Sequence, residues 1–212
     1  MPRCASLPFG VVSDHYFTAE PASPDERREI EVSLAGSRYA VQVASGVFSP
    51  GHVDAGTQVL LKEAPQPPAA GTFLDLGCGW GPIALSLALQ SPAATVYAVD
   101  VNERALDLTR RNAERLGCKG IRAALPDEVP ADVTFDLIWS NPPIRVGKGA
   151  LHELMQTWLT RLAPGGSAYL VVQKNLGADS LAKWIDATLD GVVTRRHAVG
   201  KGFRVLHVSR AE

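Results

Sequence analysis

The residues best suited to chemistry begin with the run from Asp75 to Gly81. Glycines at Gly77, Gly79 and Gly81 follow a short apolar segment, and Cys78 stands between the first two. An apolar run that breaks into glycines and resumes with a helical pattern predicts a buried strand, a tight turn and a helix N-terminus. Because glycine lacks a Cβ, a ligand can lie directly against such a turn. Asp75 would place a carboxylate beside a cationic group of that ligand.

A second acid follows the next predicted strand. Asp100 comes directly after the apolar run 95–99, and an acid at this position typically accepts hydrogen bonds from ribose hydroxyls. The G-x-G-x-G spacing differs from the G-x-G-x-x-G fingerprint of dinucleotide binders, in which a helix N-terminus faces a pyrophosphate. Asp75 would repel a pyrophosphate but suits the amino group of a methionine moiety. The pattern therefore favours S-adenosylmethionine (SAM) over NAD.

The third motif is Asn141-Pro142-Pro143-Ile144, which follows a later predicted strand. An exocyclic amine conjugated to a ring is a poor nucleophile because its lone pair is delocalised. The side-chain oxygen of Asn141 and the carbonyl oxygen of Pro142 can accept both N–H groups of such an amine and free its lone pair. The two prolines fix φ and keep that carbonyl aimed inward. Asn-Pro-Pro alone is more often a turn, and its position after the glycine turn and the ribose acid favours the chemical interpretation.

Together these motifs resemble those of SAM-dependent methyltransferases that modify planar amino groups. The lead-in Gly46-Val47-Phe48-Ser49, the following Asp54-Ala55-Gly56-Thr57 and the ending Gly202-Phe203-Arg204-Val205-Leu206 are similar to those of the small-domain methyltransferases that make N2-methylguanine in ribosomal RNA. The resemblance runs from about His15 to Arg210. It implies SAM as cofactor and ribosomal RNA or a ribosomal subunit, the small one favoured, as substrate.

The resemblance also assigns roles to individual positions. The cofactor-binding residues that it implies are Phe48, Asp75, Gly77, Cys78, Gly79, Gly81, Asp100, Val101, Asn102 and Asn141. The catalytic residues are Asn141, Pro142 and Pro143. Phe48 could instead pack in the core, Cys78 is better explained as a small packed residue than as a nucleophile, and Trp80 could flank the cofactor or pack. Asp127 is a candidate partner of the adenine amino group.

The expected substrate contacts begin at Ile144. Many relatives carry an aromatic residue there, which would stack on the target base with about 1–3 kcal/mol. Isoleucine gives only apolar contact, which moves the expected stacking to Tyr16, Phe17 or Phe203. Arg145 and Lys148 could bind substrate phosphate, although ordinary surface charge explains them slightly better.

The order of apolar patterns predicts an α/β, Rossmann-like fold. Strands and helices alternate over 72–77, 82–90, 95–100, 103–116, 120–125, 134–140, 149–162, 167–173 and 178–189. Such alternation implies a mostly parallel sheet covered on both faces, here of seven strands. A C-terminal antiparallel hairpin, 192–199 with 203–210, would close it, and Pro164-Gly165-Gly166 is expected to interrupt the chain before the strand at 167.

The N-terminal part is expected to form a separate extension. Residues 29–43 alternate around a Gly36-Ser37 turn, which predicts a small β-hairpin. Asp54 would cap a helix over 55–64. We therefore divide the chain into an extension at 1–70 and a methyltransferase core at 71–212.

Composition sets limits on location and partners. With 212 residues, 46% hydrophobic and 20% charged, the chain is typical of globular proteins. It contains no apolar run near the roughly 20 residues that span a bilayer and no secretory signal pattern, so we expect a cytoplasmic protein without a membrane partner. The three cysteines and five histidines lack metal-ligand spacing, so no metal site is expected.

The net charge of −1 disfavours strong non-specific binding of polyanions. Two local clusters temper that conclusion. The first is C-terminal and comprises Arg195, Arg196, Lys201, Arg204 and Arg210. The second lies on one predicted helix and comprises Arg110, Arg111, Arg115 and Lys119. Either could face RNA or be balanced by neighbouring acids.

Two other functions remain open at this point. The same Asn-Pro-Pro chemistry would support methylation of a glutamine amide in a protein such as a release factor. The chain could also bind SAM without catalysis, although the intact motif disfavours this. A nicotinamide oxidoreductase is disfavoured by the glycine spacing.

Overall fold

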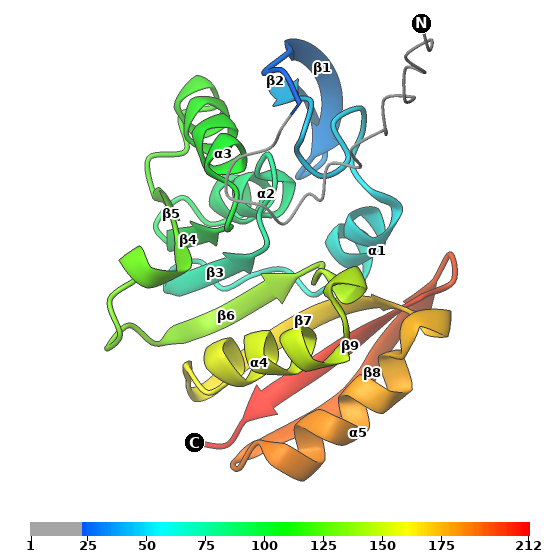
Figure 1. Cartoon of the computed structure of the whole chain (residues 1–212). Coiled ribbons are helices and arrows are strands. Elements are labelled where there is room, and N and C mark those ends of the chain that lie inside the picture. Colours follow the sequence, from blue (N-terminus) through cyan, green and yellow to red (C-terminus); the bar gives the residue numbers. More distant parts are fainter. Residues whose placement is uncertain (1–22) are drawn as a thin grey trace, which may run out of the picture.

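The computed structural model describes residues 23–212, which form an α/β fold with a central twisted sheet (Figure 1). The stacking role expected of Tyr16 or Phe17 lies outside this range, as do His15, where the family resemblance begins, and Cys4, the first of the three cysteines. The predicted Rossmann-like architecture is confirmed, with seven strands in the main sheet and a separate two-stranded hairpin.

The main sheet has the strand order β5-β4-β3-β6-β7-β9-β8. Its strands are β3 (Thr72–Leu76), β4 (Thr95–Val99), β5 (Ile121–Ala124), β6 (Phe135–Ser140), β7 (Leu162–Gln173), β8 (Val192–Gly200) and β9 (Phe203–Arg210). The first five are parallel, and β9 runs antiparallel to both β7 and β8. The order reverses between β3 and β6, so the carboxyl ends of these two strands form the place where open α/β sheets bind ligands.

Helices cover both faces of the sheet (Figure 1). On one face lie α1 (Ala55–Glu63), α2 (Pro82–Gln90) and α3 (Glu103–Arg115), and on the other α4 (Lys148–Leu159) and α5 (Ala178–Thr188). Successive residues of each strand point to opposite faces. In β3, for example, Phe73 packs in the core beneath α2 while Leu74 packs in the core beneath α4.

The N-terminal hairpin consists of β1 (Arg27–Leu34) and β2 (Ser37–Ala44). Its apolar face joins the same hydrophobic core as α2 and α3. The buried side chain of Asn112, in α3, holds the hairpin in place. Its Nδ2 donates to the backbone carbonyl of Gln42 at 2.9 Å, and its Oδ1 accepts from the backbone amide of Gln42 at 2.7 Å. An Arg27–Asp107 ion pair of 2.6 Å adds a second link between the hairpin and α3. The division of the chain at residue 70 stays a prediction.

The sequence prediction was wrong at one connection. Helix α4 ends at Leu159, and β7 begins at Leu162 and continues through Pro164-Gly165-Gly166 instead of starting after them. The pairing of β6 with β7 shifts register between Phe135 and Leu137. Residues 163–166 of β7 therefore face a single residue of β6, and this bulge or irregularity accommodates the proline and the two glycines within the strand.

Within residues 23–212, no helix combines the length and the apolar character needed to cross a membrane.

Candidate active site

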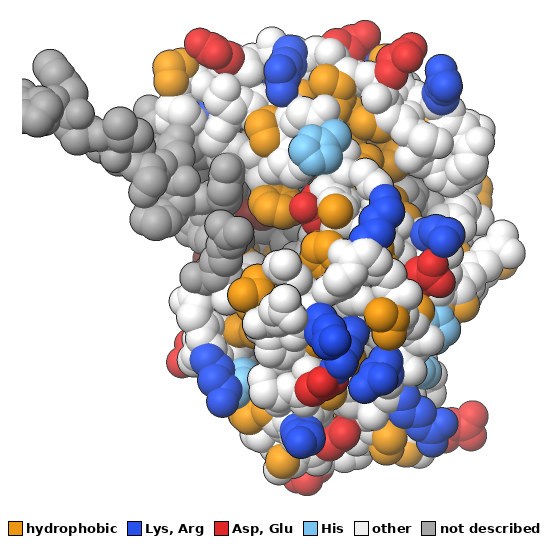
Figure 2. All heavy atoms as spheres, turned by 90° about the vertical axis from the view of Figure 1, so that its right-hand side faces the viewer, with side chains coloured by type: hydrophobic (Ala, Val, Ile, Leu, Met, Phe, Trp, Pro, Cys, Tyr) orange, Lys and Arg blue, Asp and Glu red, His pale blue; other side chains and the backbone are white. Residues whose placement is uncertain are grey.

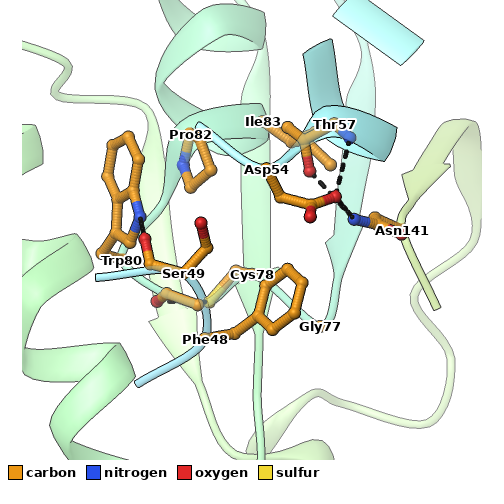
Figure 3. A pocket seen from close by; sticks show the side chains of 11 residues that line it. Phe48, Ser49, Asp54, Thr57, Gly77, Cys78, Trp80, Pro82, Ile83 and Asn141 are labelled. Atoms are coloured by element: carbon orange, nitrogen blue, oxygen red, sulfur yellow. Dashed lines mark hydrogen bonds between the residues drawn. The ribbon is translucent and has the colours of Figure 1, made fainter. Parts of the chain in front are cut away.

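The site lies where β3 and β6 end side by side. The buried hydroxyl of Ser140, the last residue of β6, donates to the carbonyl of Leu76, the last residue of β3, at 2.7 Å. This bond keeps Gly77 and Asn141, which directly follow these paired strand ends, next to each other, and both line one pocket (Figure 3). The residues that line it are Phe48, Ser49, Asp54, Thr57, Gly77, Cys78, Gly79, Trp80, Pro82, Ile83 and Asn141.

The glycine turn exposes backbone to this pocket. Gly77 and Gly79 have φ values of +78° and +56°, and a Cβ on either would meet no atom within 4 Å. The turn is anchored on the end of β4, because the Gly77 amide donates to the Val99 carbonyl at 2.8 Å and the Gly79 amide donates to Asp100 Oδ2 at 2.9 Å. Open space beside a fixed backbone is what a ligand lying against the turn requires.

Asp75 is fully buried beneath the turn. Its Oδ2 accepts from the Ala84 amide at 2.8 Å, whereas its Oδ1 is buried and has no hydrogen-bond partner. Burial raises the pKa of this carboxyl to about 8; the Ala84 amide opposes the shift and the charge of Asp100 adds to it. A buried acceptor without a partner is costly. An unpartnered buried carboxylate oxygen suits a cationic group such as the amino group of SAM, but Asp75 lies beneath the glycine turn and does not itself line the pocket.

Asp100 and its neighbours lie at the end of β4. Burial raises the pKa of Asp100, while the amides of Asn102 and Gly79 oppose this. Each carboxylate oxygen accepts one of these amides, at 3.0 Å for Asn102 and 2.9 Å for Gly79, and keeps capacity for a ribose hydroxyl. Val101 is 41% exposed. The side chain of Asn102 caps α3 and donates to the Gly46 carbonyl at 2.8 Å, so any contact with a cofactor falls to its backbone.

The loop before α1 carries Phe48 to the rim of the pocket. Trp80 Nε1 donates to the Ser49 carbonyl at 3.3 Å, and the Asn102 contact holds the loop at Gly46. Phe48 is 43% exposed whereas Trp80 is buried. Phe48 is therefore not a core residue, and Trp80 has a packing role as well as its place in the pocket lining.

Asn141 is held by groups of α1. Its Nδ2 donates to Asp54 Oδ2 at 2.8 Å and contacts Thr57 Oγ1 at 3.1 Å (Figure 3). A carboxylate only accepts hydrogen bonds, so the amide group is turned with its nitrogen toward Asp54. This leaves Oδ1 as the acceptor available to a substrate. The Pro142 carbonyl accepts from the Ile144 amide at 2.9 Å and has a second lone pair for another donor.

The predicted substrate residues are less tightly grouped. Ile144 is half-buried against the core beneath α4, and Lys148 is exposed at the start of that helix. The structure does not describe the side chain of Arg145. Phe203 comes close to Asn141, since a Cβ on Gly56 would lie 3.0 Å from Phe203 Cε1 and 3.3 Å from Asn141 Oδ1.

Three further positions have surroundings that bear on their expected roles, and Cys78 agrees with its interpretation as a packed residue. Asp127 is exposed on a short 3-10 turn outside the pocket lining. Burial raises the pKa of the Cys78 thiol, which suits a packed residue and not a nucleophile. Gly81 starts α2 with a φ of +95°, and a Cβ there would lie 3.0 Å from Thr109 Oγ1; this glycine serves packing against α3.

Sequence reasoning missed Asp54 and Thr57 as pocket residues, treating Asp54 only as a helix cap. The signal was present in Asp54-x-Gly56-Thr57, because a capping acid and a hydroxyl one turn apart share one side of a helix start. No group of three or more His, Cys, Asp or Glu side chains within 23–212 could hold a metal ion.

Several cations of the two basic clusters form ion pairs or hydrogen bonds within the protein. Arg204 is almost buried and pairs with Asp179, and Arg210 donates to the carbonyls of Thr160 and Leu162 at 2.9 and 2.7 Å. In the helix cluster, Arg111 pairs with Asp107 at 2.9 Å and Arg115 pairs with Glu29. Lys148, Lys174 and Lys201 are exposed. Figure 2 shows Lys and Arg side chains gathered over the lower half of the face that α1 and the β8–β9 turn present.

Comparison with known proteins bears on this site. The sequence profile of the methyltransferase small domain matches residues 38–207. YbxB of Bacillus subtilis, an uncharacterized protein, is 34% identical over 184 residues, which are 85% of this chain and 92% of that protein. Ribosomal RNA small subunit methyltransferase C of Pseudoalteromonas translucida is 38% identical over 64% of this chain and 39% of its own length. The corresponding enzyme of Pseudomonas entomophila is 30% identical over 94% and 59%, respectively.

Among solved structures, the Thermus thermophilus 16S rRNA N2 G1207 methyltransferase in complex with AdoMet and guanosine has a TM-score of 0.73. It is 23% identical, and the match covers 89% of this chain and 52% of that one. The chain thus spans only about half of the rRNA methyltransferases that it matches, and at this identity the structural likeness establishes the fold alone.

Proposed function

The chain belongs to the methyltransferase small-domain family, a family of SAM-dependent methyltransferases, and on this premise we propose that it methylates the exocyclic amino group of guanine in small-subunit ribosomal RNA. The names of the related ribosomal RNA methyltransferases support this choice of acceptor. The observation that carries the proposal is the orientation of Asn141, whose Nδ2 is held by Asp54 while its Oδ1 remains an acceptor in the pocket that the glycine turn also lines.

The cofactor, when bound, supplies an activated methyl group on a sulfonium centre. The protein then has to hold the acceptor amine in line with that methyl. Asn141 Oδ1 accepts one N–H of the amine and the free lone pair of the Pro142 carbonyl accepts the other, so that the nitrogen becomes tetrahedral. Aligning two reactants in this way is worth about 7–11 kcal/mol in favourable cases.

The cofactor residues have separate tasks. Asp75 binds the amino group through its unpartnered Oδ1, Asp100 accepts from the ribose, and Gly77 and Gly79 leave room for the ligand against the turn. Phe48 covers the pocket from the rim. The proton of the methylated amine leaves to water, and no histidine is among the residues of 23–212 that line the pocket.

Exposed lysines at the same edge of the sheet suit an RNA acceptor. Lys174 directly follows β7, and its amide donates to the Gly202 carbonyl at 2.9 Å, which places it beside Lys201 in the β8–β9 turn. Lys148 starts α4 just beyond the Asn-Pro-Pro motif. Such charges contact phosphates and position a nucleic acid without reading its sequence.

The test is transfer of tritium from labelled SAM to three acceptors, namely isolated small subunits, free rRNA and release factors. The proposal expects label in rRNA that digests to N2-methylguanosine, and expects Asn141→Ala to lose it. Label on release factors alone would contradict the RNA acceptor and favour glutamine-amide methylation. SAM binding without transfer to any of the three would indicate a non-catalytic module.

A further inference from the structure

Asp54 uses one carboxylate oxygen for two purposes. Its Oδ2 accepts from the amides of Gly56 and Thr57 at 2.8 and 3.3 Å, which caps α1, and from Asn141 Nδ2 at 2.8 Å. Asp54 and Asn141 are 87 residues apart in the chain, and both are partly buried. The start of α1 and the end of β6 are thus joined through a single atom (Figure 3).

This contact decides which end of the Asn141 amide faces the substrate. The terminal torsion of an asparagine is broad and roughly two-fold, so packing alone does not select one orientation. Thr57 Oγ1, at 3.1 Å from Nδ2, does not select one either, because a hydroxyl both donates and accepts. Asp54 is the group that discriminates, since its carboxylate accepts only. It also polarises the amide and strengthens Oδ1 as an acceptor.

The local backbone is shaped for this approach. Gly56 lies between the groups concerned, and a Cβ there would be 3.0 Å from Asp54 Oδ2, 3.0 Å from Phe203 Cε1 and 3.3 Å from Asn141 Oδ1. A side chain at position 56 would force these neighbouring side chains to give way by a few tenths of an ångström. The glycine therefore permits the close contact on which the amide orientation depends.

We propose that Asp54 is a positioning residue that sets the Asn141 amide for the acceptor amine. The inference rests on the proposed role of Asn141 Oδ1 in methyl transfer. Asp54 acts through Asn141 and need not touch the substrate. The β-branched Thr57 and the small Gly56 complete the arrangement without fixing its direction.

Three substitutions separate positioning from helix capping. Asp54→Ser keeps a good cap, but its shorter side chain cannot also reach Asn141. Asp54→Asn keeps both functions, because the amides of Gly56 and Thr57 select its side-chain oxygen for the shared position. Asp54→Ala loses both. We expect about a 10- to 100-fold fall in single-turnover rate for the serine and alanine variants, as for a misplaced reactive group, and near-normal turnover for the asparagine variant.

The thermal midpoint distinguishes the two losses. Asp54→Ser should have the same thermal midpoint as the wild type. The midpoint of Asp54→Ala should be about 2–4 °C lower, which is the effect expected from the loss of one helix cap in a protein of this size. In an Asn141→Ala background, Asp54→Ser should have no further effect on turnover. The proposal would be overturned if Asp54→Ser turned over at the wild-type rate. It would also be overturned if Asp54→Ser slowed the Asn141→Ala enzyme by the same factor as it slows the wild type.

A measurement without cofactor or acceptor keeps this test independent of the proposed substrate. In the nitrogen-15 spectrum of the free protein, the side-chain NH₂ pair that disappears in Asn141→Ala belongs to Asn141. We expect these protons to exchange at least about tenfold more slowly than those of exposed asparagines, because hydrogen bonding to a carboxylate protects them, and to lose that protection in Asp54→Ser. Fast exchange in the wild type would refute the contact even if the serine variant did not fold. If the Asn141 protons exchange slowly but no methyl group is transferred to RNA, the contact between Asp54 and Asn141 stands and only the proposed RNA acceptor is refuted.

Discussion

The hydroxyl of Ser140 donates to the carbonyl of Leu76 at 2.7 Å, although the two residues are 64 positions apart. The bond joins the carboxyl ends of β6 and β3 and so fixes the distance between the glycine turn and Asn141. We predict that Ser140→Ala lowers the free energy of unfolding by about 1–3 kcal/mol, because a buried carbonyl loses its donor, and also slows methyl transfer.

A matched control is Ser91→Ala. Ser91 is also fully buried, and its hydroxyl donates to the Pro68 carbonyl at 2.7 Å away from the pocket lining. Chemical denaturation should give similar stability losses for both variants, whereas single-turnover transfer should slow only in Ser140→Ala. Equal rates in the two variants would show that the strand-end bond does not position the site.

Asp75 should make stability depend on pH. Its folded-state pKa of about 8 lies above the ordinary 3.8, so the folded protein binds this proton more tightly than the unfolded chain. The carboxyl therefore lowers stability progressively as pH rises from about 4 to about 8. Asp75→Asn lacks this titration, and its thermal midpoint should rise relative to the wild type over that range. Parallel curves for the two proteins would contradict the assigned pKa.

The same carboxyl should couple SAM binding to proton release. At about pH 6.5, Asp75 is mostly protonated in the free protein and ionises when a cationic amino group reaches it. Calorimetry in buffers of different ionisation enthalpy should therefore report a proton released on binding to the wild type. Asp75→Asn should bind more weakly and release none. A buffer-independent heat in the wild type would place the amino group elsewhere.

Phe48 should contribute to cofactor binding and little to folding. The residue is 43% exposed at the rim of the pocket, so Phe48→Ala leaves no core cavity. We expect the dissociation constant for SAM to rise about 5- to 30-fold, which corresponds to about 1–2 kcal/mol of lost apolar contact, with an unchanged thermal midpoint. Leu176→Ala is the control, because Leu176 is 45% exposed outside the pocket lining and its loss should change neither quantity.

Lys174 and Lys201 should bind the RNA backbone. Replacing each with glutamine removes one phosphate contact, so the slope of log K against log salt should become shallower by about 0.7–0.9 per residue. SAM affinity should stay the same. Arg111→Gln serves as the comparison, because Arg111 is a half-exposed cation on α3 that pairs with Asp107 at 2.9 Å, and it should leave the slope unchanged. An unaltered slope in the lysine variants would move the RNA path to another face.

The fold was largely predictable because each element carried a local signal. The apolar run before Gly77 and the cap at Asn102 predicted β3 and the start of α3 correctly. Gly165 and Gly166 misled the prediction of β7, since a proline and two glycines resemble a loop, whereas here they form the irregular part of β7 itself.

The site was predictable as far as single motifs reach. Gly77, Gly79 and Asn141 meet in one pocket as their positions at strand ends predicted. The contact between Asp54 and Asn141 could not be predicted, because it joins residues 87 positions apart and depends on where α1 packs. The contacts of three cluster cations were hidden for the same reason. Arg204 and Arg196 both pair with Asp179, and Arg210 donates to backbone carbonyls, so these three of the five cations in the C-terminal cluster have partners within the protein.

The most direct test of the account is single-turnover methyl transfer to small-subunit rRNA by Asn141→Ala, with SAM binding measured on the same sample. Asn141 Oδ1 is proposed to act on the amine in the transition state, so the account predicts a rate loss of at least about 100-fold while calorimetry still detects bound SAM. A variant that transfers the methyl group at the wild-type rate would contradict the account.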